Sequence, residues 1–209
     1  MKAQARSPIR ILCVDDHPLV REGVARKIGR QADMKVIGTA SSGEEAVELF
    51  ERDHPDVVLM DLQLPGMRGT DAIAAIRRLD PHARIIVLTM YGGDEDIFRA
   101  IHAGAASYLF KDMLSNDLVS IVRQVHGGER PIPDVVAQRL ASRVGLSPRE
   151  VDVLELIADG KRNKEIADVL GITQETVQTH IKRLFVKLNV NDRTAAVTVA
   201  LSRGIVHIK

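Results

Sequence analysis

The hydrophobic positions of the chain follow two patterns, one before Gly127 and Gly128 and one after them. Before these glycines, short continuous apolar runs alternate with segments whose apolar residues recur every three or four positions. Such runs are typical of strands buried on both faces, and the wider spacing is typical of helices with one buried face. This alternation predicts a doubly wound, five-stranded parallel sheet, because parallel strands need crossover connections. We expect strands at 9–14, 34–40, 57–61, 84–89 and 107–110, and helices at 18–30, 42–50, 69–79, 94–103 and 114–126.

Polar residues that could carry chemistry stand where the predicted strands end. Ligands of such sheets bind at the carboxyl ends of the strands. A single strand-end acid is ordinarily a turn or cap residue, but several polar groups at the same edge predict one shared site. The residues are Asp15 and Asp16 after the first strand, Asp61 at the third, Thr89 at the fourth and Lys111 after the fifth.

The chemistry that these residues favour is the transfer of a phosphoryl group to Asp61. Three carboxylates in one crevice repel one another unless a cation is present, and Mg²⁺ commonly binds carboxylates, water and phosphate oxygens. The Lys111 ammonium and the Thr89 hydroxyl suit phosphate oxygens. The sequence therefore predicts Asp61 as the nucleophile, with Mg²⁺ and Lys111 stabilising the charge on the group in transit.

After Gly128 the pattern becomes helical throughout. Residues 129–133 contain two prolines and no helical period, which is typical of a linker. Farther on, Ser147 and Glu150 form a capping-box signature around Pro148. We expect helices at 133–143, 147–158, 163–170, 173–188 and 192–203. The chain is therefore predicted to end in a second, smaller all-α domain.

The helix predicted at 173–188 has one apolar and one polar face. Taken alone, it could be an ordinary solvated amphipathic helix. The helix before it and the tight turn at Gly171 instead favour a helix-turn-helix, whose second helix can enter the major groove of DNA. The apolar face carries Val177, Ile181, Leu184 and Leu188, and the polar face carries Gln178, Thr179, Lys182 and Arg183.

The composition argues against a disulfide-bonded or membrane-spanning protein, but it does not indicate whether the partner is nucleic acid or protein. The net charge is +1, divided as −1 before Gly145 and +2 from there on, so any basic surface must be local. The single Cys13 lies in an apolar run and cannot form an intramolecular disulfide. Residues 1–10 are polar, and no apolar run is long enough to span a bilayer. We therefore expect a soluble, cytoplasmic protein without a signal peptide and without membrane contact.

Residues 9–127 resemble the receiver domain of two-component response regulators, a flavodoxin-like fold. The resemblance rests on Asp15 and Asp16, the segment Met60 to Gly66 around Asp61, and then Thr89, Tyr108 and Lys111. It implies that a sensor histidine kinase phosphorylates Asp61. It also implies that Asp16, Asp61 and the Gln63 carbonyl bind Mg²⁺, with Asp15 assisting through water. Thr89 and Tyr108 correspond to the switch pair, and Gln63 and Tyr91 to positions that tune the lifetime of the phosphoryl group.

From residue 146 to about residue 205 the chain resembles the LuxR-type helix-turn-helix, and as a whole it resembles the NarL/FixJ family. The motifs are Leu146 to Glu150, Asn163 to Ala167, Glu175 to Val177 with His180, and Lys187, Leu188, Arg193 and Ala195. The resemblance implies base contacts from Gln178, Thr179 and Lys182, and phosphate contacts from Lys164, Arg183 or Lys187. Gln178 replaces a lysine that is common in this family. The apolar helix at 192–203 would suit the family's two-fold dimer on inverted half-sites.

The resulting prediction is a phosphorylation-switched, dimeric transcription regulator that binds double-stranded DNA. We expect a receiver domain at 1–127, a linker at 128–145 and a helix-turn-helix domain at 146–209. The protein would have no enzymatic activity beyond Mg²⁺-dependent self-phosphorylation and autodephosphorylation. One alternative is a phospho-independent DNA-binding regulator; another is a phosphatase or phosphotransferase, which would need a general acid where Gln63 stands. The histidines show no metal-ligand spacing and are assigned peripheral roles.

Overall fold

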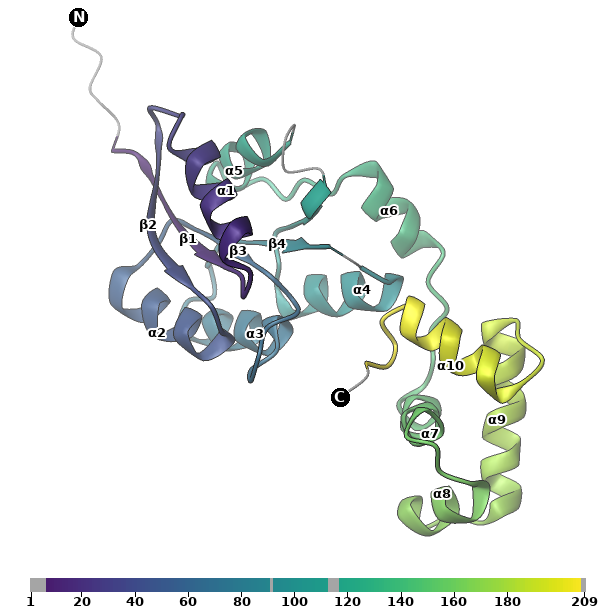
Figure 1. Ribbon diagram of the computed structural model, residues 1–209. Helices are drawn as coiled ribbons and strands as arrows, with labels where there is room; N and C mark the ends of the chain where they lie inside the picture. The colour runs from purple at the N-terminus through teal and green to yellow at the C-terminus, as the bar shows by residue number, and fades with distance from the viewer. Residues whose placement is uncertain (1–6, 91, 113–116, 208–209) are drawn as a thin grey trace, which may run out of the picture. The chain divides into compact units, whose positions relative to one another are not determined.

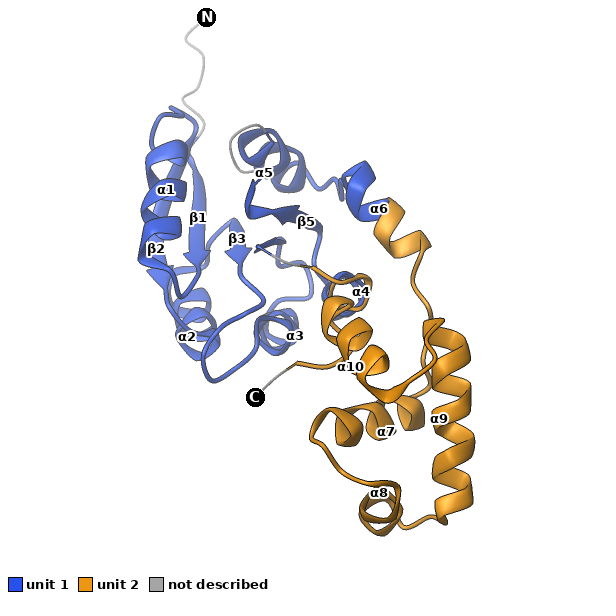
Figure 2. Cartoon of the chain, turned by 45° about the vertical axis from the view of Figure 1, so that its right-hand side comes forward, with its two compact units in different colours: residues 1–91, 97–137 blue, residues 92–96, 138–209 orange. Residues whose placement is uncertain are grey.

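The computed structural model describes residues 7–90, 92–112 and 117–207. The chain divides into two compact units, which Figure 2 colours separately. The first unit comprises residues 1–91 and 97–137, and the second comprises residues 92–96 and 138–209. The domain limits expected from the sequence, at residues 127 and 146, stay a prediction.

The first unit is built on a five-stranded parallel sheet with the strand order β2-β1-β3-β4-β5 (Figure 1). Every residue of the last three strands in the chain is buried, as expected for strands covered on both faces. The doubly wound α/β fold expected from the sequence is confirmed. The strands are β1 (Ile9–Val14), β2 (Met34–Ala40), β3 (Val57–Met60), β4 (Ile85–Thr89) and β5 (Ser107–Phe110).

Helices cover both faces of this sheet. The apolar sides of α1 and α5 share one core cluster with alternate residues of the strands, including Ile11, Cys13 and Leu59. Figure 1 shows α2 and α3 together on the opposite face. Burial raises the pKa of the Cys13 thiol to about 12, so this side chain is a packing residue without thiolate chemistry. The helices are α1 (Pro18–Ile28), α2 (Gly43–Asp53), α3 (Gly69–Leu79), α4 (Asp94–Ala103) and α5 (Leu118–His126).

Local sequence signals account for the helix starts of this unit. Pro18 occupies the first turn of α1, where its missing N–H costs nothing. The Ser42 hydroxyl caps α2 by accepting a hydrogen bond from the Glu45 N–H, at 3.2 Å. The Glu45 carboxylate accepts from the N–H of Ser41, one residue before the expected partner, at 2.7 Å. Helix ends differ from the predicted ones by two or three residues at α1 and α2, because terminal turns depend on caps and packing.

The second unit holds a small helical core. Helices α7, α8, α9 and α10 pack around buried side chains that include Leu154, Ile166, Val177 and Leu184. The capping box predicted at Ser147 is present in full, with both reciprocal hydrogen bonds formed. Across residues 7–90, 92–112 and 117–207, no helix is long and apolar enough to span a membrane. The bounds are α7 (Pro148–Ala158), α8 (Asn163–Leu170), α9 (Gln174–Leu188) and α10 (Arg193–Ser202), and α6 (Asp134–Ala141) contains the boundary between the two units at residue 137.

Candidate functional site

Two strands of the sheet bring Asp15 and Asp61 to one edge. The backbone N–H of Asp61 donates to the Val14 carbonyl at 2.9 Å, and that of Asp15 donates to the Ala40 carbonyl at 3.0 Å. Parallel pairing of β1 with β2 and β3 thus sets both acids at the same level of the sheet. Asp15 is 1% exposed and Asp61 is 2% exposed, so neither carboxylate is a solvated surface charge.

Lys111 forms ion pairs with both of these buried acids. Its Nζ lies 2.7 Å from Asp15 Oδ2 and 2.7 Å from Asp61 Oδ2. The lysine follows β5, two strands away from β3 in the sheet, so only the folded strand order brings it to Asp61. Buried charges are tolerated when they are paired in this manner. The predicted meeting of Asp15, Asp61 and Lys111 is therefore present in the structure.

The environment shifts the pKa values of the paired groups. Burial raises the pKa of the Asp61 carboxyl above its ordinary value, although the Lys111 ammonium opposes this rise. Burial alone would lower the pKa of Lys111, but its hydrogen bonds with Asp15 and Asp61 outweigh that effect and raise it. Lys111 is therefore an ammonium at neutral pH. The ionised Asp61 is costly to bury, which favours its reaction or pairing with a positively charged group.

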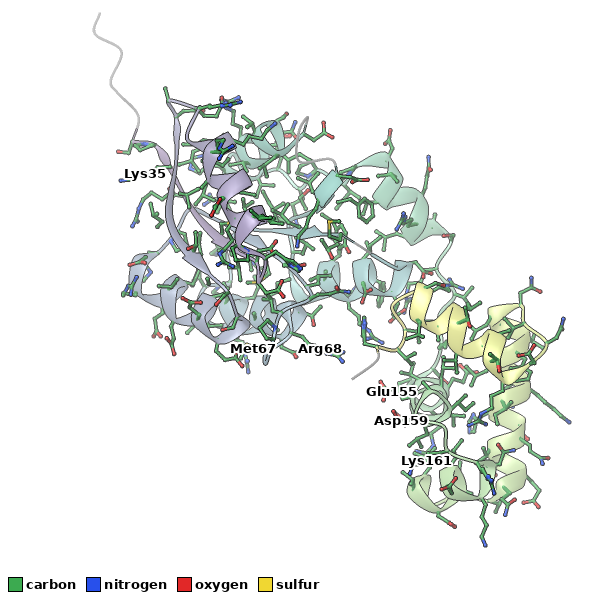
Figure 3. All side chains as sticks on the ribbon, viewed as in Figure 1. Lys35, Met67, Arg68, Glu155, Asp159 and Lys161 are labelled. Carbon is green, nitrogen blue, oxygen red and sulfur yellow. The ribbon has the colours of Figure 1, made fainter. Side chains whose placement is uncertain are left out.

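The loop after β3 folds tightly over Asp61. A Cβ at Gly69 would lie 2.0 Å from the Asp61 carbonyl oxygen, so only glycine fits there. Gly66 adopts a positive φ of 71°, and the Glu44 carboxylate accepts the N–H of Met67 at 2.8 Å. Met67 and Arg68 are labelled in Figure 3 at the edge of this unit. Gly66 and Gly69 thus shape the loop that borders the site.

Asp16 and His17 complete the rim of the acidic pocket. The His17 Nδ1 lies 2.6 Å from Asp16 Oδ1 and 3.3 Å from Asp15 Oδ1. One potential metal-ligand atom from each of Asp15, Asp16, His17 and Asp61 lies within 4.8 Å of the others. Sequence spacing did not reveal His17 as part of this group, and its position directly after two strand-end acids was the available signal. The four side chains form a candidate cation site.

The remaining predicted residues of the first unit occupy different positions around the pocket. Thr89 ends β4 and is 1% exposed, and Tyr108 in β5 is fully buried, with its ring in an edge-to-face arrangement with that of Phe110. The Gln63 side chain is exposed, and its N–H donates to Asp61 Oδ1 at 3.3 Å. Tyr91 lies outside the described residues. The roles predicted for these residues stay predictions.

The second unit contains the predicted pair of helices joined by a tight turn. Gly171 ends α8 with a φ of 63°, and Thr173 then caps α9 by accepting the N–H of Thr176 at 3.2 Å. Buried Val177 and Leu184 hold α9 on the core. The predicted DNA-contact side chains Gln178, Thr179, Lys182, Arg183 and Lys164 are exposed. A polar, partly basic face of α9 is therefore available to a ligand.

Lys187 differs from the other predicted DNA contacts because its ammonium is engaged inside the unit. Its Nζ lies 2.7 Å from the Oε2 of Glu150. Glu150 is a buried residue, with only 3% of its surface exposed. Glu150 also accepts the N–H of Ser147 at 2.7 Å. Burial would raise the pKa of Glu150, but the bonds from Lys187 and Ser147 outweigh it and lower the pKa. The pair joins α9 to the first turn of α7.

We expect Glu150→Gln to lower the free energy of unfolding of this helical unit by about 1 kcal/mol. This loss lies between the contribution of an exposed ion pair and that of a buried hydrogen bond to a charged group. A carboxylate whose pKa is lowered by folding stabilises the folded state at pH values above its unfolded-state pKa of 4.5. This stabilisation is lost as the pH falls through the folded-state pKa. Stability of the wild type should therefore fall more steeply than that of Glu150→Gln on acidification below that value. Thermal unfolding by circular dichroism measures this difference, with exposed Lys182→Gln as the control. Equal pH dependence of wild type and Glu150→Gln would contradict the prediction.

Charge is distributed unevenly over the helices of the second unit. Exposed Asp152, Glu155 and Asp159 recur along one face of α7 and its end, and Figure 3 labels Glu155 and Asp159. A polyanion would be repelled by that face and attracted to the face that carries Lys182 and Arg183 on α9. The charges therefore single out α9 as the element that suits nucleic acid.

The first unit has the fold and acidic pocket of a signal-receiver domain, and the second has a helix-turn-helix. Comparison with protein families agrees: residues 11–123 match the response regulator receiver domain, and residues 144–200 match the bacterial regulatory proteins of the luxR family. The chain belongs to the NarL/FixJ family of two-component response regulators, with a receiver and a LuxR-type DNA-binding domain.

Curated relatives cover nearly the whole chain. The transcriptional regulatory protein LiaR of Bacillus subtilis is 41% identical over 92% of this chain and 96% of its own length. The nitrate/nitrite response regulator NarL of Escherichia coli K12 is 37% identical over 91% of this chain and 94% of its own length. The structure of RcsB from Salmonella enterica serovar Typhimurium bound to a promoter is 26% identical, with a TM-score of 0.74 over 94% of this chain and 99% of that one.

Proposed function

We propose that phosphorylation of Asp61 switches the DNA binding of this response regulator. The observation that carries the proposal is the buried carboxylate of Asp61 at a strand end, paired at 2.7 Å with Lys111 and bordered by Asp15 and Asp16. A buried carboxylate held beside a fixed cation and a group of further acids is suited to accept a phosphoryl group. A sensor histidine kinase is the proposed donor, as expected for this family.

Mg²⁺ is the proposed cofactor of this step. Asp16 and Asp61 would hold the ion directly, Asp15 would assist through water, and the Gln63 carbonyl would complete the set. The donor chemistry fits, since carboxylate and carbonyl oxygens are the ligands that Mg²⁺ prefers. When bound, the ion supplies positive charge to the phosphate oxygens. The excess of negative charge around Asp61, which Lys111 alone does not balance, supports its presence.

The residues of the chain have separate tasks in the transfer. An Oδ of Asp61 attacks phosphorus, a new O–P bond forms, and the P–N bond of the donor phosphohistidine breaks, with a proton returning to the imidazole. Lys111 moves its charge from the two carboxylates to an oxygen of the incoming group. Thr89 donates its hydroxyl to another oxygen, and Tyr108, which is fully buried, is its partner in the switch. Hydrolysis reverses the state when water attacks phosphorus and Asp61 leaves, at a rate tuned by Gln63 and Tyr91.

Double-stranded DNA is the proposed partner of α9. Gln178, Thr179 and Lys182 would read base edges, while Arg183 and Lys164 would contact phosphates. Lys187 was expected to contact phosphate as well, but its bond to Glu150 competes with that role. Binding as a homodimer to inverted half-sites is proposed from α10, where Val197, Val199 and Leu201 are only partly buried against the core of this unit. RcsB has been solved as two dimers bound to DNA, which supports this mode.

The test uses the full chain with Mg²⁺ and a small phosphodonor such as acetyl phosphate. Binding to a random pool of duplex DNA is selected and sequenced with and without the donor. We expect enrichment of an inverted repeat and a tighter complex after phosphorylation. Selection of the same sites with the same affinity in both states would favour the phospho-independent alternative, and failure to select DNA would contradict the DNA-binding proposal.

We expect Gln178→Lys to change both the preferred sequence and the salt dependence of DNA binding. Glutamine can pair with adenine through two hydrogen bonds, whereas lysine favours guanine or phosphate. One added phosphate contact should steepen the slope of log affinity against log salt by about 1. Fluorescence anisotropy across a salt series measures this. The control is Gln138→Lys, which adds the same charge at an exposed position of α6. Unchanged preference and slope in Gln178→Lys would contradict the base-contact assignment.

A further inference from the structure

His17 lies at the acidic pocket, and its imidazole does not cap the helix that follows it. It is the N-cap residue of α1, yet its side chain makes no capping hydrogen bond. Its backbone N–H donates to Asp15 Oδ1 at 2.9 Å, which fixes the residue beside the acids. The side chain is 65% exposed, and its Nδ1 approaches Asp16 Oδ1 to 2.6 Å. One ring nitrogen thus faces the pocket while the other can remain in solvent.

The dimensions of the group suit a single cation. Potential ligand atoms of Asp15, Asp16, His17 and Asp61 all lie within 4.8 Å of one another. Two ligands on opposite sides of a small divalent cation are about 4.2 Å apart, because each bond is about 2.1 Å long. Small side-chain adjustments are therefore enough to place an imidazole nitrogen and the carboxylate oxygens around one ion.

The types of ligand atom, carboxylate oxygen and imidazole nitrogen, also influence which cation the site prefers. Oxygen ligands alone suit Mg²⁺, whereas an imidazole raises the affinity for first-row transition dications. We propose that His17 is a ligand, through Nδ1, of the cation held by Asp16 and Asp61, and that it makes the site prefer Mn²⁺ and similar ions over Mg²⁺. This inference rests on the metal site of the proposed function. It gives the site a stronger preference for Mn²⁺ over Mg²⁺ than a pocket of acids alone would have.

A positioning role for His17 makes different predictions. In that role, the imidazole N–H would only orient the Asp16 carboxylate, as the present 2.6 Å contact does. Asparagine at position 17 could keep such a hydrogen bond through its amide N–H, but it offers a metal only its amide oxygen and no nitrogen ligand. His17→Asn therefore separates a ligand from a residue that orients a neighbouring carboxylate.

The experiment titrates the full chain with Mn²⁺ and measures the free ion by electron paramagnetic resonance, with and without competing Mg²⁺. Pulsed measurements on bound Mn²⁺ detect a directly coordinated ¹⁴N nucleus. We expect ¹⁴N coupling in the wild type and none in His17→Ala or His17→Asn. The ratio of the Mg²⁺ Kd to the Mn²⁺ Kd should fall about tenfold in both variants, the low end of the effect of altering a metal ligand's surroundings. His82→Ala removes an exposed histidine elsewhere and should change neither quantity.

Failure of this inference is distinguishable from failure of the metal site itself. Mn²⁺ that binds with dependence on Asp61, shows no ¹⁴N coupling and keeps its selectivity in His17→Ala would overturn the role of His17 alone. Wild type that binds no Mn²⁺ or Mg²⁺, or binds them equally well in Asp61→Asn, would overturn the site. If His17→Ala fails to fold, the ¹⁴N spectrum of the wild type, compared with His17→Asn, still decides.

Discussion

Asp61→Asn is expected to abolish formation of an acyl phosphate on this protein. Asparagine keeps the shape of the side chain but removes the anionic oxygen that would attack phosphorus. The buried partner Lys111 cannot replace that nucleophile, because an ammonium has no free electron pair. The full chain is incubated with acetyl phosphate and Mg²⁺, and the mass increase of one phosphoryl group is measured by intact mass spectrometry. The wild type should gain one group, and Asp61→Asn should remain at background.

A matched control separates this effect from a general loss of charge. Asp71→Asn neutralises an exposed acid in the first turn of α3 and should be phosphorylated like the wild type. Any increase in DNA affinity caused by acetyl phosphate should disappear together with the modification in Asp61→Asn. Equal modification of wild type and Asp61→Asn would place the acceptor at another residue and refute the central assignment.

Lys111→Met is expected to destabilise the receiver part by about 3 kcal/mol at neutral pH, the low end for breaking a buried ion pair. Methionine fills a similar space but leaves the carboxylates of Asp15 and Asp61 buried without their cation. Urea unfolding followed by near-ultraviolet circular dichroism of buried Tyr108 measures the loss. Exposed Lys35→Met, in β2, is the control for removing a lysine from the same unit.

The pH dependence of Lys111→Met identifies the cause of the loss. Burial raises the pKa of Asp61, and Lys111 lowers it, so the pKa must rise further in the variant. A carboxyl group whose pKa is higher in the folded state favours folding at pH values below its unfolded-state pKa. It disfavours folding as the pH rises through its folded-state pKa. Lys111→Met should therefore regain stability relative to wild type as pH falls toward the unfolded value. Combining it with Asp61→Asn should cost less than the two single changes together. Additive losses would show that Lys111 does not stabilise through Asp61.

Much of the fold was predictable because its elements have strong local patterns. Continuous apolar runs such as residues 57–60 and 85–88 read as buried strands, and the capping signals at Ser147 and Thr173 marked helix starts. Helix ends were less certain, since the last turn depends on what packs against it. The meeting of Asp61 with Lys111 could be predicted only through the rule that parallel strands present their carboxyl ends together.

Other features needed distances in three dimensions. No sequence spacing indicates that Lys187 binds Glu150, since the contact depends on how α9 packs on the first turn of α7. The same holds for His17, which stands next to the acids in sequence but whose ring direction is set by the start of α1 and by its N–H bond to Asp15. Their side-chain positions assign Lys187 to an ion pair in place of a phosphate contact, and His17 to the acidic pocket in place of a peripheral role.

By itself, the sequence determined the alternation of strands and helices, the helix-turn-helix, and the set of polar residues at one sheet edge. These follow from periodicity and from the topology of parallel sheets, which depend on residue type and order. Only the tertiary structure decided that Lys111 bridges Asp15 and Asp61, that His17 joins Asp16, and that Lys187 is engaged by Glu150. Such contacts depend on side-chain directions and on distances of a few ångströms, which packing sets and local sequence does not.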